Sequence, residues 1–288
     1  MVLTALLVSV SCVRGQRPPG TPAAPAAPSG LRAPEPDSLT VALWHLDESS
    51  GTQVADAGPF RLDGTAGIAT RVQFGRIDRA RGFERSLDSF VYVPYDRALE
   101  TPRAFTIEAW LRPRSFGPYE DTPIVGRWSL EANRQSWLFA LAGRRLVSPT
   151  LPPSPGLHLS LFPETPPGHL LFAFQPEAAG PPRGFASARP ISLERWTHVA
   201  VTFDGEVLKF FLDGVLDAQY ATADRIRATP AGLLVGNAFD PRNLTRFGGD
   251  LRLDPTGGAE PRYGFDGWID ELRISNAARE DFPTVVSR

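Results

Sequence analysis

The residues that could carry chemistry in this 288-residue chain are its histidines, its carboxylates and a single cysteine. The four histidines, His45, His158, His169 and His198, are scattered along the chain. None of them stands in an H-E-x-x-H motif, and the sequence holds no G-x-S-x-G motif and no phosphate-binding loop. These patterns speak against metalloprotease, serine-nucleophile and nucleotide-dependent chemistry. We therefore predict no catalytic residues.

Charge and composition narrow the class of protein further. Lys and Arg number 30 against 32 Asp and Glu, so the net charge is -2 and the chain lacks the basic surface of a nucleic-acid binder. The 29 prolines and 26 glycines disfavour a helical bundle and favour many short strands joined by turns. The sequence therefore predicts a β-rich protein that does not bind nucleic acid.

Side chains in two turn-rich stretches are candidates for contact with a ligand. Tyr119 and Trp128 lie in or near a loop that contains Gly117 and Pro118, and Phe239, Asn243 and Tyr263 lie in or near the stretch at 240–263. Aromatic rings that stay exposed on loops could stack on sugar rings or contact a protein. The alternative is that these rings fold over the edge of the domain and pack there.

The single cysteine, Cys12, follows an apolar segment, residues 2–11, which is shorter than the roughly 20 residues that cross a bilayer. An apolar N-terminal segment of this length is typical of a secretory signal peptide. Ser11 directly before Cys12 resembles the lipobox of bacterial lipoproteins, in which the cysteine carries lipid. We therefore predict a signal segment over residues 1–12, lipidation of Cys12 and a place in the bacterial cell envelope as an outer-membrane lipoprotein. The alternative is an ordinary secretory signal and a secreted protein.

Two regions follow this segment. Residues 13–38 are rich in proline and alanine, cannot build a core, and are predicted to form a semi-rigid polyproline tether. Residues 39–288 show a β pattern, with alternation over 197–203 and Asp-Gly pairs at 204–205 and 213–214 that predict hairpins with both turn residues at positive φ. Further strands are predicted at 41–45, 89–93, 105–111, 137–141, 157–161, 170–174, 233–235 and 268–274, and long loops within 149–190 and 240–263. Only 76–85 and 276–281 could hold even a turn or two of helix. This spacing predicts an all-β fold, a two-sheet antiparallel sandwich or jelly roll.

Five segments in this order resemble the laminin-G-like branch of the concanavalin A-like lectin/glucanase superfamily. They are LWHLDESSG at 43–51, FVYVP at 90–94, FTIEAWL at 105–111, WTHVAVTFDG at 196–205 and GWIDELRIS at 267–275. The resemblance implies a concanavalin A-like jelly roll over residues 39–288. It does not by itself fix the function, because this fold carries lectins, adhesion modules, hydrolases and lyases.

The glucanase members of this superfamily place carboxylates on alternate residues of one strand as Glu-x-Asp-x-(x)-Glu. Here Glu-x-Asp occurs at Glu35 and Asp37, inside the predicted tether, and no third carboxylate follows. We therefore predict a non-catalytic, surface-tethered module that binds a glycan or a cell-surface protein. The alternatives are a polysaccharide hydrolase or lyase with an unrecognised site, and a structural envelope protein.

Members of this superfamily often hold calcium, which takes six to eight oxygen ligands. Asp47 and Asp56 flank a loop after the first predicted strand, and Asp270 lies on the closing strand. Because first and last strands are commonly neighbours in such sandwiches, we predict that these three carboxylates bind one calcium ion. The alternatives are that they are turn-forming and solvated residues, or that Arg61 and Arg273 neutralise them.

Overall fold

The structure is a computed structural model that describes residues 31–100, 103–129, 134–144, 146, 165–254 and 264–283. Its regular structure is almost entirely β, apart from two short 3-10 turns, η1 (Arg97–Leu99) and η2 (Pro241–Asn243). Within these ranges, no helix has the length and apolar character needed to span a membrane.

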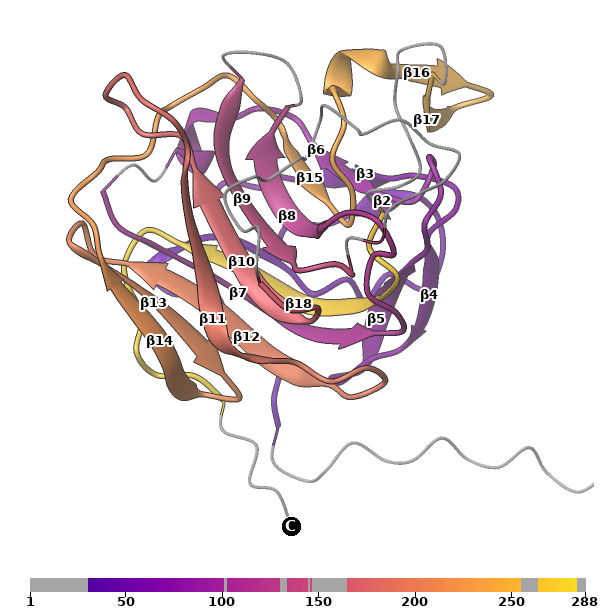
Figure 1. The fold of residues 1–288 in the computed structure, drawn as a ribbon. Coiled ribbons are helices and arrows are strands. Elements are labelled where there is room, and N and C mark those ends of the chain that lie inside the picture. The colour runs from indigo at the N-terminus through magenta and orange to yellow at the C-terminus, as the bar shows by residue number, and fades with distance from the viewer. Residues whose placement is uncertain are drawn as a thin grey trace, which may run out of the picture.

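Two antiparallel eight-stranded sheets form the body of the protein (Figure 1). Sheet A consists, in order, of β14 (Val215–Ala221), β13 (Val207–Leu212), β12 (Thr197–Phe203), β7 (Phe105–Pro113), β18 (Gly267–Ser275), β5 (Arg79–Phe83) and β4 (Arg71–Phe74), with β1 (Thr40–Trp44) also paired to β18. Sheet B consists of β11 (Arg183–Pro190), β10 (His169–Phe174), β9 (Gln135–Leu141), β8 (Thr122–Trp128), β15 (Leu233–Val235), β6 (Val91–Val93), β3 (Gly64–Ala66) and β2 (Gln53–Val54). The predicted two-sheet antiparallel jelly roll is confirmed.

The core lies between the sheets and follows from the alternation of residues along each strand. On β12, Val199, Val201 and Phe203 enter the main apolar cluster, whereas His198 and Ala200 face the other side of sheet A. The core also holds a group of large aromatic side chains, Trp137, Phe105, Phe139, Phe172 and Phe174. Burial of each such side chain stabilises the fold by about 1.5–3 kcal/mol.

All predicted strands except the one at 157–161 are present. Residues 157–161 lie outside the described residues. Neither of the two segments that could have held a turn or two of helix forms one. Residues 79–83 form β5, because pairing with β4 and β18 outweighs a weak local helix preference. Residues 276–281 form a segment without regular structure that begins with a bend, and Thr106 holds it on β7 by donating to Ala277 O and accepting from Arg279 N.

The two Asp-Gly turns differ from each other. Asp213 and Gly214 have φ of 51° and 78°, as predicted for a two-residue hairpin. At the other turn only Gly205 has positive φ, and the Asp204 carboxylate accepts hydrogen bonds from the Glu206 and Val207 amides. The prediction for Asp204 was wrong because its side chain closes a longer, three-residue loop.

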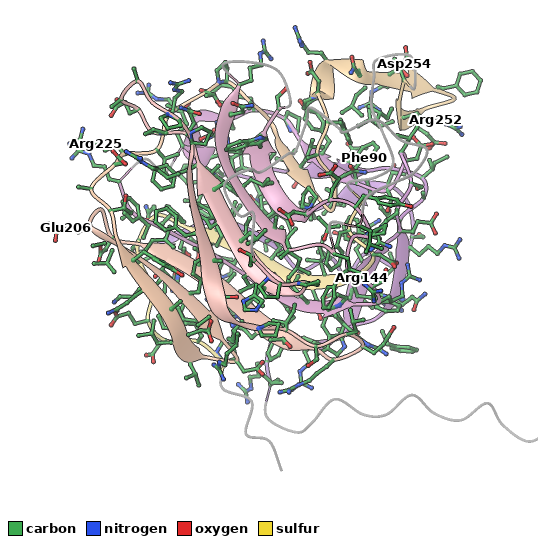
Figure 2. All side chains as sticks on the ribbon, viewed as in Figure 1. Phe90, Arg144, Glu206, Arg225, Arg252 and Asp254 are labelled. Carbon is green, nitrogen blue, oxygen red and sulfur yellow. The ribbon has the colours of Figure 1, made fainter. Side chains whose placement is uncertain are left out.

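The turn-rich stretch after residue 240 contains a separate hairpin, β16 (Leu244–Phe247) and β17 (Asp250–Leu253). Figure 2 shows this hairpin, with Arg252 and Asp254, standing out from the body. Leu251 and Leu253 belong to the same apolar cluster as Phe90 and so fix the hairpin to the body, whereas Phe247 at the hairpin turn is 72% exposed.

Candidate functional site

A partly exposed tryptophan, Trp268, lies on the outer face of sheet A. Its neighbour Ile269 faces the core, so Trp268 points the other way. The strand register places Trp268 opposite Arg112 of β7 on one side and opposite Gly82 of β5 on the other. Gly82 in turn lies opposite Arg71 of β4. Since glycine has no side chain, the sheet is hollowed between Trp268 and Arg71.

This hollow is a pocket of about 60 Å³. It is lined by Ala69, Arg71, Gln73, Gly82, Phe83, Glu84, Arg114 and Trp268. The guanidinium groups of Arg112 and Arg114 lie 5.0 and 5.1 Å from the centre of the indole ring, within the range of a cation–π contact. The pocket therefore combines one indole with planar side chains that donate and accept hydrogen bonds.

Acidic residues hold two of these arginines in place. Arg112 pairs with Glu194 at 2.8 Å, and Arg114 pairs with Asp266 at 2.6 Å. Asp266 also accepts hydrogen bonds from Ser115 and Arg85. Such exposed pairs contribute little to stability, but they orient the guanidinium groups beside Trp268.

A second group of polar residues lies where β18 changes its partner strand. Up to Ile269, β18 pairs with β5, and from Leu272 it pairs with β1. Between these pairings the register with β7 shifts, and Glu271 has a φ of 52°. This bulge places one additional residue in the strand. Ile269 and Leu272 therefore both face the core, and the two residues between them, Asp270 and Glu271, do not belong to it.

The bulge brings Glu271 beside the residues that follow β1. His45, Asp47 and Glu271 each offer one possible ligand atom, and these three atoms lie within 4.8 Å of one another. His45 Nδ1 donates to Glu271 Oε2 at 2.6 Å, and the Arg79 amide donates to Asp47 Oδ1 at 2.8 Å. Asp270 Oδ2 accepts from the amides of Arg76 and Ile77. We call His45, Asp47 and Glu271 the switch-point group.

Burial perturbs the acidic residues here. It raises the pKa of Asp47 to about 6 and the pKa of Asp270 to about 9, against backbone hydrogen bonds that lower both. The pKa of Glu271 is also raised by burial, although the hydrogen bond and charge of His45 oppose this. The same hydrogen bond with Glu271 raises the pKa of His45. Burial therefore disfavours the charged form of these carboxyl groups, and Asp270 keeps its proton at neutral pH.

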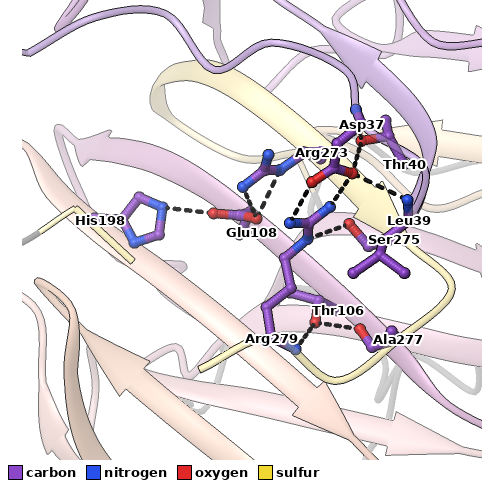
Figure 3. Close-up of polar contacts among 10 residues, drawn as sticks. All are labelled: Asp37, Leu39, Thr40, Thr106, Glu108, His198, Arg273, Ser275, Ala277 and Arg279. Atoms are coloured by element: carbon purple, nitrogen blue, oxygen red, sulfur yellow. Dashed lines mark hydrogen bonds and ion pairs between the residues drawn. The ribbon is translucent and has the colours of Figure 1, made fainter. Parts of the chain in front are cut away.

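A third polar network ties the outer face of sheet A to both ends of the described chain (Figure 3). The buried Glu108 carboxylate accepts from His198 Nε2 at 3.1 Å and forms an ion pair with Arg273 at 2.7 Å. Arg279, in the segment after β18, pairs with Asp37 ahead of β1. Burial would raise the pKa of Glu108, but the hydrogen bond and charge of His198 and the charge of Arg273 lower it overall. We interpret this network as structural, because its carboxylate is fully enclosed.

A family model described as the concanavalin A-like lectin/glucanases superfamily matches residues 85–281. The chain belongs to this superfamily. Curated protein sequences gave no match. Among solved structures, the chain resembles the binding domain of Paraclostridial Mosquitocidal Protein 1, with a TM-score of 0.55 and 12% identity over 84% of this chain and 49% of that chain.

Two botulinum neurotoxin domains are also similar. The serotype G binding domain gives a TM-score of 0.52 with 12% identity, over 83% of this chain and 48% of that one. The serotype D ligand binding domain, in complex with N-acetylneuraminic acid, gives 0.54 with 10% identity over 83% and 48%. This superfamily member thus spans about half the length of each toxin domain, and at these identities the likeness shows a shared fold.

The aromatic residues predicted to bind a ligand differ in how far they are buried. Trp128 is the last residue of β8 and is buried against Leu138, and Phe239 is buried edge-on against Phe90. Their prediction as ligand contacts was wrong, because both rings pack over the sheets. Tyr119 remains partly exposed in the loop between β7 and β8.

The remaining predicted residues have separate positions. Asn243 ends η2 and is partly exposed, with its carbonyl accepting from the Asp254 amide. Tyr263 and the predicted lipidation site Cys12 lie outside the described residues. The structure therefore leaves Tyr119 and Asn243 as partly exposed candidates, in loops apart from the Trp268 pocket.

The three predicted calcium ligands do not assemble as a set. Asp56 is buried and both of its oxygens accept backbone hydrogen bonds, from Leu43, Gly58 and Leu62. Asp47 and Asp270 do lie near the closing strand, but the group that forms there is completed by His45 and Glu271. An imidazole nitrogen differs from the oxygen shell that calcium takes. Calcium binding itself stays a prediction.

The arginines offered as the alternative do not neutralise these carboxylates by direct pairing. Arg273 pairs with Glu108, and Arg61 donates to the Asp56 backbone carbonyl. Sequence reasoning found Asp47 but missed Trp268 and the two residues, His45 and Glu271, that complete the switch-point group. The bulge at Glu271 and the outward direction of Trp268 could have been found from the closing strand, in which apolar residues stand three apart at Ile269 and Leu272 and then two apart at Ile274. That spacing signals a bulge, and it places Trp268 outside the core.

Proposed function

We propose that this protein is a non-catalytic glycan-binding module and that the Trp268 pocket is its ligand surface. The observation that carries the proposal is a partly exposed indole in a pocket that Arg, Gln and Glu side chains also line. A sugar ring offers an apolar face of C–H groups that packs on an indole. Its hydroxyls can exchange hydrogen bonds with Arg71, Gln73 and Glu84.

The chemistry of the pocket favours binding over hydrolysis. Glycoside hydrolysis generally uses two carboxyl groups placed on either side of the scissile bond. Glu84 is the one carboxylate among the residues that line the pocket. The carboxylates that do converge, Asp47, Asp270 and Glu271, are held at the bulge of β18, and Asp270 and Glu271 are buried.

The comparisons support this proposal at the level of the fold. The similar solved structures are binding domains, and the serotype D toxin domain was studied with a bound sugar acid. Since the shared fold alone does not determine a ligand, the proposal depends on the Trp268 pocket.

Glycan-array binding followed by calorimetry of the full chain tests the proposal. Trp268→Ala should weaken binding about tenfold or more, which corresponds to roughly 1.4 kcal/mol. Phe247→Ala is the matched control, because Phe247 is another exposed aromatic residue but lies on the β16–β17 hairpin. Loss of binding in Phe247→Ala alone would move the site to the hairpin. Failure of the wild type to bind any glycan, together with capture of a purified cell-surface protein, would refute the glycan proposal.

We also propose that the module is held at the bacterial cell envelope by lipid on Cys12 and the tether at residues 13–38. The support is the order of apolar segment, cysteine and Pro/Ala-rich stretch in the sequence. When the full chain is produced in a bacterium, the wild type should partition into a detergent phase and Cys12→Ser should not. Equal partitioning of the two proteins would contradict the anchor.

A further inference from the structure

We propose that the switch-point group, His45, Asp47 and Glu271, binds a divalent transition-metal ion of the zinc type. This site is separate from the Trp268 pocket, and the inference does not depend on the proposed function. It rests on the convergence of one imidazole and two carboxylates, and on carboxylate oxygens buried there without a protein partner.

The geometry is close to that of a metal site. The three ligand atoms lie within 4.8 Å of one another, and the closest pair, His45 Nδ1 and Glu271 Oε2, is 2.6 Å apart. Zinc binds imidazole nitrogen and carboxylate oxygen at about 2.0–2.2 Å, so its tetrahedral ligands stand about 3.3 Å apart. Binding would release to solvent the proton that His45 Nδ1 now donates to Glu271, because a metal ligand must be deprotonated. Side-chain shifts of about 1 Å would bring all three atoms to that spacing, and a water molecule would complete the tetrahedron.

A buried oxygen of Glu271 lacks a partner that a cation would supply. Within the described chain, Glu271 Oε1 and Asp270 Oδ1 are buried and have no hydrogen-bond partner. The Glu271 side chain is 1% exposed. Leaving buried carboxylate oxygens unpaired is costly, and such groups in native proteins call for an explanation such as an ion. A cation held by both carboxylate oxygens of Glu271 would supply the partner that Oε1 lacks.

The backbone holds these residues in position before any ion arrives. The Arg79 amide fixes Asp47 through Oδ1 and leaves Oδ2 for a ligand bond, and the amides of Arg76 and Ile77 fix Asp270. Leu46 and Glu271, on the two segments that meet here, both have positive φ, a conformation that non-glycine residues adopt at some cost. The His45 side chain is 30% exposed, which gives an ion a way in.

The donor set favours a transition metal over calcium. Calcium takes six to eight oxygen ligands, whereas zinc and its neighbours accept imidazole together with carboxylate. Asp56, the residue that would have added an oxygen, is engaged by three backbone amides. The ion would join the end of β1 to the bulge of β18 and, through Asp47, to β5.

Metal binding by the full chain tests the inference. All proteins carry Cys12→Ser and no histidine tag, because a thiolate or a tag would bind zinc itself. After dialysis against Zn²⁺, the parent should retain one equivalent, and its Tm should rise by about 5–10 °C at a hundredfold excess over Kd. With Co²⁺ it should give the visible absorption of a tetrahedral site.

Three variants complete the test. His45→Asn and Glu271→Gln should each lose the bound zinc and the Tm shift, whereas His169→Asn, which changes a histidine on β10, should keep both. His45→Asn alone decides the matter if Glu271→Gln does not fold, because His45 is partly exposed. The inference is overturned if the parent retains no zinc, if His45→Asn binds zinc as well as the parent, or if Ca²⁺ raises the Tm and Zn²⁺ does not.

Discussion

Replacing Asp56 is expected to destabilise the protein strongly and in a way that does not depend on metal ions. Asp56 is 1% exposed. Its Oδ1 accepts from the Leu43 amide at 2.8 Å and the Gly58 amide at 2.7 Å, and Oδ2 accepts from the Leu62 amide at 2.8 Å. The side chain therefore joins β1 to the loop that follows it.

The magnitude follows from the hydrogen bonds that each variant loses. A buried donor left unsatisfied costs about 1–3 kcal/mol, so Asp56→Ala should cost about 3–6 kcal/mol after some relaxation. In Asp56→Asn the remaining oxygen can still accept from Leu43 and Gly58, but an amide group now faces the Leu62 N–H. That variant should cost about 2 kcal/mol and lower the Tm by about 4–8 °C.

Urea denaturation with and without chelator measures these costs. Asp63→Asn is the matched control, because the exposed Asp63 accepts a single hydrogen bond, from the Asp56 amide. It should cost under about 1 kcal/mol. A loss for Asp56→Asn that vanishes in chelator would show that Asp56 acts as a metal ligand and would refute the hydrogen-bond explanation.

Two further predictions concern sheet A and its contacts. Gly236 has a φ of 74°, and a Cβ at this position would lie 2.3 Å from the buried Phe83 ring. Gly236→Ala should therefore lower the free energy of unfolding by about 2–4 kcal/mol, measured by thermal unfolding. Gly180→Ala is the control and should be neutral, because a Cβ there meets nothing within 4 Å. For Glu108, whose folded pKa is lowered, the stabilising contribution is present above the ordinary value of 4.5 and is lost as the pH falls below it. The difference in Tm between wild type and Glu108→Gln should therefore narrow as the pH is taken from 7 to 3, and a constant difference would contradict the assignment.

Much of the fold could be predicted because strand alternation is a local property of the sequence. On β12, the apolar residues Val199 and Val201 face the core, as the two-residue period requires. The errors arose where contacts distant in sequence decide the structure. Residues 79–83 are a strand because β4 and β18 pair with them, and no local pattern in that segment shows those partners.

The candidate site was harder to predict for the same reason. Trp128 and Phe239 have the composition of exposed loop aromatics, and only the packing of Leu138 and Phe90 shows that they are covered. Asp56 and Asp47 look alike in sequence, but one accepts three amides and the other lies in the switch-point group. The joining of His45 to Glu271 depends on where β18 changes partners, which requires the sheet to be known.

The position of β18 has a consequence for the order in which the protein can fold. It is the last strand in the described chain, yet it lies inside sheet A, paired to β7 on one side and to β5 and β1 on the other (Figure 1). Until β18 has been synthesised, β7, β5 and β1 have no shared partner, and sheet A cannot close. Such long-range pairing makes folding slow. Because β18 joins the strands β14–β13–β12–β7 to the strands β5–β4, these two parts can form one sheet only after β18 has been synthesised, and the assembly of sheet A is therefore a late step in folding.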